Sequence, residues 1–324
     1  MEPAYRACSR KHACPRFNTH FNLKYYLWPA FPKTAPCFFC APAIFTVFVF
    51  RLVRLVSSDH TPAVLFFNHL DPTGRSGLAG DVLTAAQFDC QAVTALTAVT
   101  VQDTGVIEEI HPISDEILDN QARCLLEDIP VNAIRAGGLY NADHVSVIAQ
   151  IAADYDSVPL VLYLGPQYAS VIEDSSDDDI EALLQATWET LIPQASCVVV
   201  DCSYLNLWAP EDDHDDENPI PVVLDAILAA GAKSCLALFC PSPDDVHQHI
   251  LLEGGDHSLA FGFFPLAGQS EAGDMISAAL ACELTRGQTL SQACENAITY
   301  THKALANGRK LGMSKLVAQR LQKS

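Results

Sequence analysis

The stretch VLFFNHLDPTGRSGLAGD, residues 64–81, decides the fold class because it joins an apolar run, a turn and the start of a helix. Val64–Phe67 is typical of a buried strand, and the Asp, Pro and Gly that follow favour a turn. A helix is expected from Gly77 to Phe88. The same alternation continues, with further strands expected at 92–101, 131–136, 159–164, 197–200, 234–239 and 258–264, and further helices at 114–127, 141–153, 177–191, 221–230, 272–284 and 290–305. Ser114 is a plausible N-cap for the helix expected at 114–127. Strands that alternate with helices of this length need parallel crossovers, so we expect an α/β fold with a doubly wound, mostly parallel sheet flanked by helices.

The composition is that of a globular protein with enough apolar residues for a core, since 49% of the 324 residues are hydrophobic and 18% are charged. A net charge of −20 argues against nucleic-acid binding, because neutralising phosphates requires a surplus of Lys and Arg.

Two acidic runs, residues 173–181 and 211–217, are expected to be solvated loops, and a metal site formed from them is the weaker interpretation. Eight of the 12 cysteines are scattered through apolar segments, which indicates buried free thiols and a cytoplasmic location.

Residues 1–60 do not follow the alternating pattern. Residues 1–58 hold eight of the 19 Lys and Arg but one acidic residue, and they show no amphipathic period. Thr34–Phe50 is uncharged, but its 17 residues include two prolines, so a membrane span is not expected. A zinc site formed by the four cysteines of this segment is also disfavoured, because their spacing is irregular. We expect an N-terminal extension over 1–60 outside the fold, one domain over 61–310 and a basic C-terminal tail over 311–324.

Loops at the carboxyl ends of the strands are where a doubly wound sheet binds ligands. Gly74 and Gly77 leave backbone N–H groups accessible at a helix start, which suits an anion, and Asp81 lies one helical turn further on. Gln102 ends the next strand and offers the amide donor and acceptor that an aminopyrimidine edge requires. Gly138 follows a later strand and permits close approach of a ligand. Each feature also has a structural explanation, because ordinary joints, loop caps and tight turns use the same residues.

The start of the helix expected at 272–284 carries the strongest catalytic signal. Small residues there leave backbone N–H groups of Ala272 and Gly273 free to hold a transferring phosphoryl group. Asp274 is placed to take the proton from an attacking hydroxyl. Alternatively, Asp274 only stabilises the helix N-terminus through the helix dipole. We prefer the catalytic interpretation.

Several of these loops, in this order, resemble the hydroxymethylpyrimidine and phosphomethylpyrimidine kinases of the ribokinase superfamily. The family pattern A-G-S-D-P-S-G-G-A-G-I-Q-A-D is similar to residues 68–81, and T-A-L-T-x-Q-D-T is similar to residues 97–104. The pattern D-I-P-V-D-A-V-K-I-G-M-L is echoed at 128–139, and the superfamily signature G-[TA]-G-D is matched at its last three positions by Ala272–Asp274. The resemblance spans about residues 62–307.

The resemblance implies an ATP-dependent kinase of thiamine biosynthesis that phosphorylates hydroxymethylpyrimidine, its monophosphate or both. It further implies Mg2+ as a cofactor and commonly a homodimer, with small molecules as the other partners. Asp274 would then be the base, the amides of Ala272–Asp274 would stabilise the phosphoryl group, and Gln102 and Asp81 would hold the ring.

The departures from the family pattern lie mainly in the half associated with Mg–ATP. Glu271 stands at the first Gly of the signature, and Asp274 stands where these pyrimidine kinases commonly have Cys. D-P-V-M is replaced at 163–166, T-P-N-x-x-E at 201–206 and V-K-G-G at 238–241. Two alternatives stay open. One is a pyrimidine-binding or regulatory homologue with weakened catalysis, and the other is a related vitamin kinase such as pyridoxal kinase.

Overall fold

Six parallel strands form the middle of the sheet, in the doubly wound arrangement expected from the sequence. The computed structural model describes residues 61–166, 176–208, 219–241, 248–254, 257–262 and 272–322. Across the sheet, the parallel strands of this described part are β2 (Gln91–Gln102), β1 (Ala63–Leu70), β4 (Ala133–Ala136), β5 (Leu160–Leu164), β6 (Cys197–Asp201) and β7 (Ser234–Cys240). The mostly parallel α/β fold is therefore confirmed.

Antiparallel strands extend the sheet on both sides of the parallel region. β3 (Ile107–Pro112) pairs with β2, and β8 (Gln248–Glu253) pairs with β7 and with β9 (His257–Gly262). A strand was predicted from the sequence at β9, but β3 and β8 were not predicted. β3 is an exposed edge strand with two glutamates, so it lacks the apolar run that reveals a buried strand.

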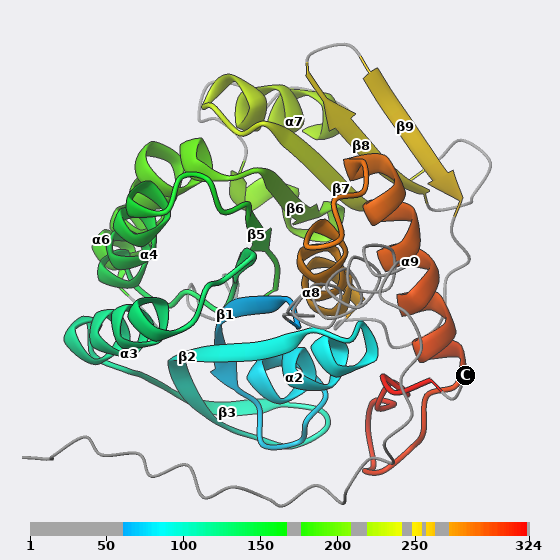
Figure 1. Cartoon of the computed structure of the whole chain (residues 1–324). Coiled ribbons are helices and arrows are strands. Elements are labelled where there is room, and N and C mark those ends of the chain that lie inside the picture. The colour runs from blue at the N-terminus through cyan, green and yellow to red at the C-terminus, as the bar shows by residue number, and fades with distance from the viewer. Residues whose placement is uncertain are drawn as a thin grey trace, which may run out of the picture. The chain divides into compact units, whose positions relative to one another are not determined.

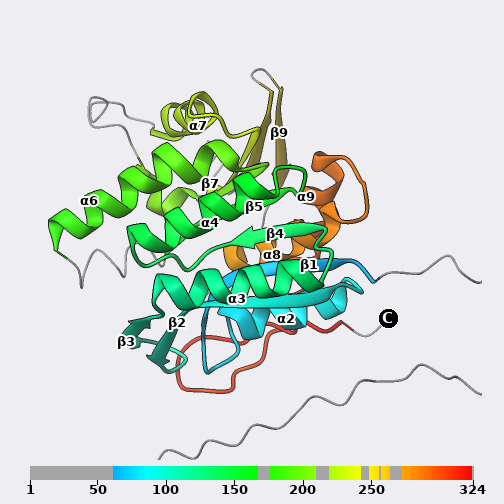
Figure 2. The same cartoon turned by 60° about the vertical axis from the view of Figure 1, so that its left-hand side comes forward.

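Helices cover both faces of the sheet (Figures 1 and 2). One face carries α3 (Asp115–Asp128), α4 (Ala142–Asp154), α6 (Asp177–Ala186) and α7 (Pro219–Ala229). The other carries α2 (Gly77–Gln87), α8 (Ala272–Leu284) and α9 (Leu290–Ala306). Short helical segments flank β6: the π-helical turn η1 (Thr187–Leu191) and the 3-10 turns η2 (Ile192–Gln194) and η3 (Cys202–Trp208). Each helix predicted from the sequence is present, and Ser114 caps α3 by accepting a hydrogen bond from the Ile117 N–H at 3.4 Å.

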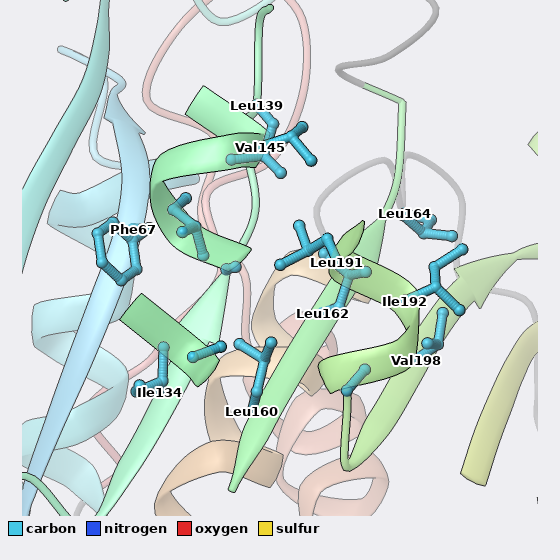
Figure 3. Close-up of a cluster of buried hydrophobic side chains, with 14 of the residues drawn as sticks. Phe67, Ile134, Leu139, Val145, Leu160, Leu162, Leu164, Leu191, Ile192 and Val198 are labelled. Carbon is cyan, nitrogen blue, oxygen red and sulfur yellow. The ribbon is translucent and has the colours of Figure 1, made fainter. Parts of the chain in front are cut away.

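Alternating side chains of the strands build a core on each face of the sheet. In β1, Leu65 and Phe67 join the core beneath α3 and α4, whereas Val64 and Phe66 join the core beneath α2 and α8. All four are fully buried. Figure 3 shows the first core, where Phe67 and its neighbours from β4, β5 and β6 pack together. Burying each large apolar side chain contributes about 1.5–3 kcal/mol, so these two layers fix the strands that position the site.

The end of the chain packs back onto the domain. Arg309 and Val317 exchange two backbone hydrogen bonds of 2.8 Å, which folds the segment into a loop. The Gln322 N–H donates to the side chain of Gln87 in α2 at 2.7 Å. The basic tail expected over 311–324 is thus, as far as residue 322, held against α2, and Arg320 within it is buried.

Several sequence-based expectations fall outside the described residues. These are the extension over 1–60 with its apolar stretch Thr34–Phe50, the acidic run 211–217, the first three residues of the run 173–181, and Glu271. The rest of the run 173–181 was expected to be a loop, but Ser176 caps α6 and residues 177–181 form its largely exposed first turns. Within the described part of the chain, no helix is long and apolar enough to cross a membrane.

Candidate active site

A fully buried arginine joins two carboxylates at the carboxyl edge of the sheet. Arg135, in β4, donates from Nη2 to Asp274 Oδ1 of α8 at 2.7 Å, and its Nη1 lies 3.5 Å from Asp81 Oδ2 of α2. Its Nε donates to Ser277 Oγ at 3.2 Å, and its guanidinium carbon lies 5.5 Å from the centre of the Tyr163 ring. The side chain is 0% exposed. A buried charge of this kind is tolerated because it is paired and hydrogen-bonded.

Asn68, in β1, bridges the same two carboxylates. Its Nδ2 donates to Asp81 Oδ2 at 2.9 Å and to Asp274 Oδ1 at 3.1 Å, and its Oδ1 accepts from the His69 N–H at 3.0 Å. Gly138 makes room for this amide, because a Cβ on Gly138 would lie 2.6 Å from Asn68 Oδ1. Gly138 also has a φ of +61°, which favours glycine.

The two carboxylates have pKa values displaced in opposite directions. Burial alone would raise the pKa of Asp274, but Arg135 and Arg320 outweigh it and hold that pKa below its usual value. Burial, together with the nearby charge of Asp274, raises the pKa of Asp81 to about 7 despite the presence of Arg135. Asp274 is therefore the group that is ionised at neutral pH, and Asp81 is the group that holds a proton most readily.

Arg320 brings a second guanidinium into this cluster from the C-terminal segment. Its Nη1 donates to Thr84 Oγ1 at 2.8 Å and its Nη2 to the carbonyl oxygen of Arg75 at 2.6 Å. The same Nη2 lies 3.7 Å from Asp274 Oδ2. Gly80 in α2 is required for this contact, since a Cβ there would lie 2.6 Å from Nη2.

One oxygen of Asp274 is left available for chemistry. Oδ1 accepts from Arg135 and Asn68, whereas Oδ2 is buried, lies 3.7 Å from Arg320 Nη2 and accepts no hydrogen bond from the residues that the structure describes. Asp274 as a whole is 6% exposed. A buried, ionised carboxylate oxygen without a donor is unfavourable unless a ligand supplies one. A substrate hydroxyl is such a donor.

Tyr163 of β5 packs on the first turn of α8. A Cβ on Gly273 would collide with the Tyr163 hydroxyl and would lie 2.7 Å from Cε2 of its ring. Ala272 is also buried, at 1% exposure. The small residues at 272 and 273 therefore allow the tyrosine to approach the helix closely, in addition to any role that their amides have toward a ligand.

The remaining predicted residues lie in the β1–α2 loop and beside it. Asp71 accepts hydrogen bonds from the backbone N–H and hydroxyl of Thr73, both at 2.7 Å, and the side chain of Gln102 bonds to it. These bonds keep its pKa low although burial alone would raise it. Gly74 has a φ of +70° and nothing within 4 Å of a Cβ position, so it is open to a ligand. Gly77 also has a positive φ, of +63°, but its Cβ position is blocked by the His69 carbonyl oxygen, so it serves the turn.

The structure thus brings Asp81 and Asp274 together, with Gly138 and Gly273 packed at the edges of the cluster. Gln102 lies outside it, on the half-buried end of β2. Asp81 was expected to hold the ring of the substrate, but it is 0% exposed and contacts Arg135 and Asn68. Asn68, Arg135 and Arg320 were not predicted from the sequence as site residues. A charged residue inside an apolar strand was a usable signal for Arg135, because such a charge needs buried partners.

A mostly parallel sheet with helices on both faces, and a carboxylate at the start of a helix at its carboxyl edge, is the arrangement expected of the ribokinase-like kinases that the sequence resembles. Comparison with known proteins agrees with this class. The model of the phosphomethylpyrimidine kinase family matches residues 71–318, and the chain belongs to this family.

Relatives and solved structures support the assignment. The chain is 24% identical over 253 residues to the hydroxymethylpyrimidine/phosphomethylpyrimidine kinase of Bacillus subtilis, covering 75% of this chain and 88% of that protein. It is 27% identical over 233 residues to the same-named protein of Mycobacterium leprae, covering 69% and 81%. Similar folds include Bacillus subtilis pyridoxal kinase in an ADP complex, with a TM-score of 0.69 at 18% identity, covering 80% of this chain and 97% of the other. Clostridium difficile phosphomethylpyrimidine kinase has a TM-score of 0.60 at 19% identity, covering 75% and 100%.

Proposed function

We propose that this chain uses ATP to phosphorylate the hydroxymethyl group of a pyrimidine, either hydroxymethylpyrimidine or its monophosphate, in thiamine biosynthesis. The observation that carries the proposal is Asp274. It lies in the first turn of α8 with one oxygen held by Arg135 and Asn68 and the other beside Arg320, without a hydrogen bond from the described residues. Membership of the phosphomethylpyrimidine kinase family supports the substrate class.

Asp274 would act as the general base. Its Oδ2 accepts the proton of the substrate hydroxyl as the hydroxyl oxygen forms a bond to the γ-phosphorus of ATP. The bond between that phosphorus and the β–γ bridging oxygen breaks, and ADP leaves with the electron pair. The low pKa of Asp274, caused by Arg135 and Arg320, keeps the carboxylate ready to accept a proton at neutral pH. The amides of Ala272 and Gly273 would stabilise charge on the transferring group.

Other residues have supporting roles in this proposal. Gln102 would bind the polar edge of the pyrimidine, with Gly74 allowing the ring to approach the backbone. Asp81 is a positioning residue, since it is enclosed with Arg135 and Asn68 and reaches the substrate only through them. Gly77 and Gly138 hold the loop geometry that their positive φ values require.

ATP would bring Mg2+ with it. Among the described residues, no group of three or more His, Cys, Asp and Glu side chains is arranged to hold a metal ion. Nucleotide-bound Mg2+ needs fewer protein ligands, because phosphate oxygens and water complete its octahedron. An ion that enters with the nucleotide would neutralise phosphate charge.

A specific observation also favours a second candidate, a pyrimidine-binding regulator with weakened catalysis. Arg135 and Arg320 both lie on Asp274, and Tyr163 packs on Gly273 where phosphate would approach. Cations beside a base make it a poorer proton acceptor, and a ring against the helix start limits access to its amides.

Product analysis separates these functions. The purified full-length protein is incubated with Mg–ATP and, separately, hydroxymethylpyrimidine, its monophosphate or pyridoxal, and phosphorylated products are identified by mass spectrometry. We expect products from the pyrimidines and little from pyridoxal. Calorimetric binding of the pyrimidine without any product would support the regulator instead, and a product from pyridoxal alone would contradict the proposed substrate class.

A further inference from the structure

Two cysteines from neighbouring strands lie with their sulfur atoms in contact. Cys202 directly follows β6 and begins η3, and Cys240 is the last residue of β7. Their Sγ atoms are 2.7 Å apart, although both are free thiols. Non-bonded carbon atoms prefer a separation of about 3.5–4.0 Å, and sulfur is larger than carbon, so this contact is close.

The backbone of β7 is shaped to make this contact. Asp201 of β6 pairs with Leu238 of β7, so the two strand ends are neighbours. Phe239 then takes a φ of +59°, a left-handed conformation that is unusual for an aromatic residue. The pairing of β7 with β8 shifts register between Ala237 and Cys240. This bulge directs Cys240 inward, where it is 0% exposed.

We propose that Cys202 and Cys240 are a redox modification site that forms a reversible disulfide when the protein meets a hydroperoxide. Cys202 is partly exposed and Cys240 is buried, which sets the order of events. The Cys202 thiolate attacks the peroxide oxygen and becomes a sulfenic acid, releasing water. The Cys240 sulfur then displaces the sulfenic hydroxyl as a second water and forms the S–S bond. Overall, two thiols lose two electrons and two protons to one hydrogen peroxide, giving one disulfide and two waters.

The reaction is expected to be slow at neutral pH. The hydrogen bond with Cys240, together with burial and the nearby groups Asp201 and Cys235, raises the pKa of the Cys202 thiol above its usual value. Little thiolate is therefore present near pH 7, and the rate should increase with pH. The disulfide would fix the spacing of the β6 and β7 ends, at the edge of the sheet where ligands bind in this architecture. Its formation does not depend on the proposed kinase activity.

Peptide mapping of the full-length protein tests the proposal. The folded protein is treated with hydrogen peroxide, its remaining thiols are blocked with N-ethylmaleimide under denaturing conditions, and the digest is analysed by mass spectrometry. We expect a linked peptide pair containing Cys202 and Cys240, lighter by two hydrogen atoms than the separate peptides and split by dithiothreitol. Cys202→Ser and Cys240→Ser should each abolish the link. Cys124→Ser, which removes an exposed thiol on α3, should leave it unchanged.

Three results would overturn the proposal. The first is full alkylation of both cysteines after peroxide treatment. The second is oxidation of Cys202 to sulfinic acid, or its linkage to another cysteine, while Cys240 stays alkylatable. The third is a bound metal ion in the purified protein that disappears in either serine variant, because the pair would then be a metal site. The peptide map of the unmodified chain decides the matter even if the serine variants fold poorly.

Discussion

The buried carboxylates of Asp81 and Asp274 are both paired with the guanidinium of Arg135. We expect Arg135→Met to destabilise the protein by about 3–5 kcal/mol, because Asp81 and Asp274 lose the cation that they share. Arg135→Lys should lie between wild type and Arg135→Met, since lysine cannot contact both carboxylates with a planar fork. Urea denaturation measures these differences.

A matched surface arginine provides the control. Arg123 also contacts two carboxylates, Asp119 and Asp154, but its side chain is 34% exposed. Arg123→Met should cost about 0–1 kcal/mol. Equal losses for Arg123→Met and Arg135→Met would mean that the buried cluster is not held together by its charges.

Asp81 should impose a pH dependence on stability. Its pKa is raised from 3.8 to about 7 in the fold, so the folded state binds this proton more tightly than the unfolded chain. Stability from this group is therefore lost as pH rises from about 4 to about 7 and is constant above that. Asp274 acts in the opposite sense, because its pKa is lowered and its contribution is lost only in acid.

We expect Asp81→Asn to gain stability relative to wild type as pH rises, by about 1–3 kcal/mol between about pH 5 and pH 8. The amide can keep the contact with Asn68 but cannot ionise. Urea denaturation at a series of pH values makes the comparison. A difference between the two proteins that does not change with pH would show that Asp81 does not titrate in this range.

At the scale of elements, α2 packs against the C-terminal segment at the point where Gly80 lies beside the Arg320 side chain. Alanine is a better helix former than glycine by about 1 kcal/mol, so Gly80→Ala should stabilise α2 considered alone. In the intact protein it should destabilise, because the new Cβ would lie 2.6 Å from Arg320 Nη2. In an Arg320→Ala background the same change should become neutral or stabilising. Thermal unfolding of the four proteins of this cycle measures the coupling, and additive effects would contradict the contact.

The elements that local patterns reveal were predicted well, and those that depend on distant partners were not. Buried strands such as β1, β6 and β7 carry apolar runs, and the helices carry their own caps and periodicity. β3 has neither signal, because it is held by pairing with β2 at an exposed edge. The residues of the site divide in the same way. Asp274 was a candidate because of the small residues at the start of its own helix. Arg135 was not, because its hydrogen bond to Asp274 joins residues 139 positions apart.

For the whole molecule, the division of the chain near residue 60 predicts the effect of a truncation. The described fold begins at Thr61, and its sheet and two hydrophobic cores are built from described residues that follow it. We therefore expect deletion of 1–58 to leave a folded, monodisperse protein with an unchanged near-ultraviolet circular dichroism spectrum. Aggregation with loss of that spectrum would show that the deleted segment contributes to folding.

We propose that this member of the phosphomethylpyrimidine kinase family transfers phosphate with Asp274 as its base. The most direct measurement is steady-state ADP release by wild type and Asp274→Asn with hydroxymethylpyrimidine, alongside Asp154→Asn as a surface control. Asp274→Asn should lower kcat by about two to four orders of magnitude with little change in KM, and Asp154→Asn should match wild type. A folded Asp274→Asn variant that keeps the wild-type kcat would contradict the account.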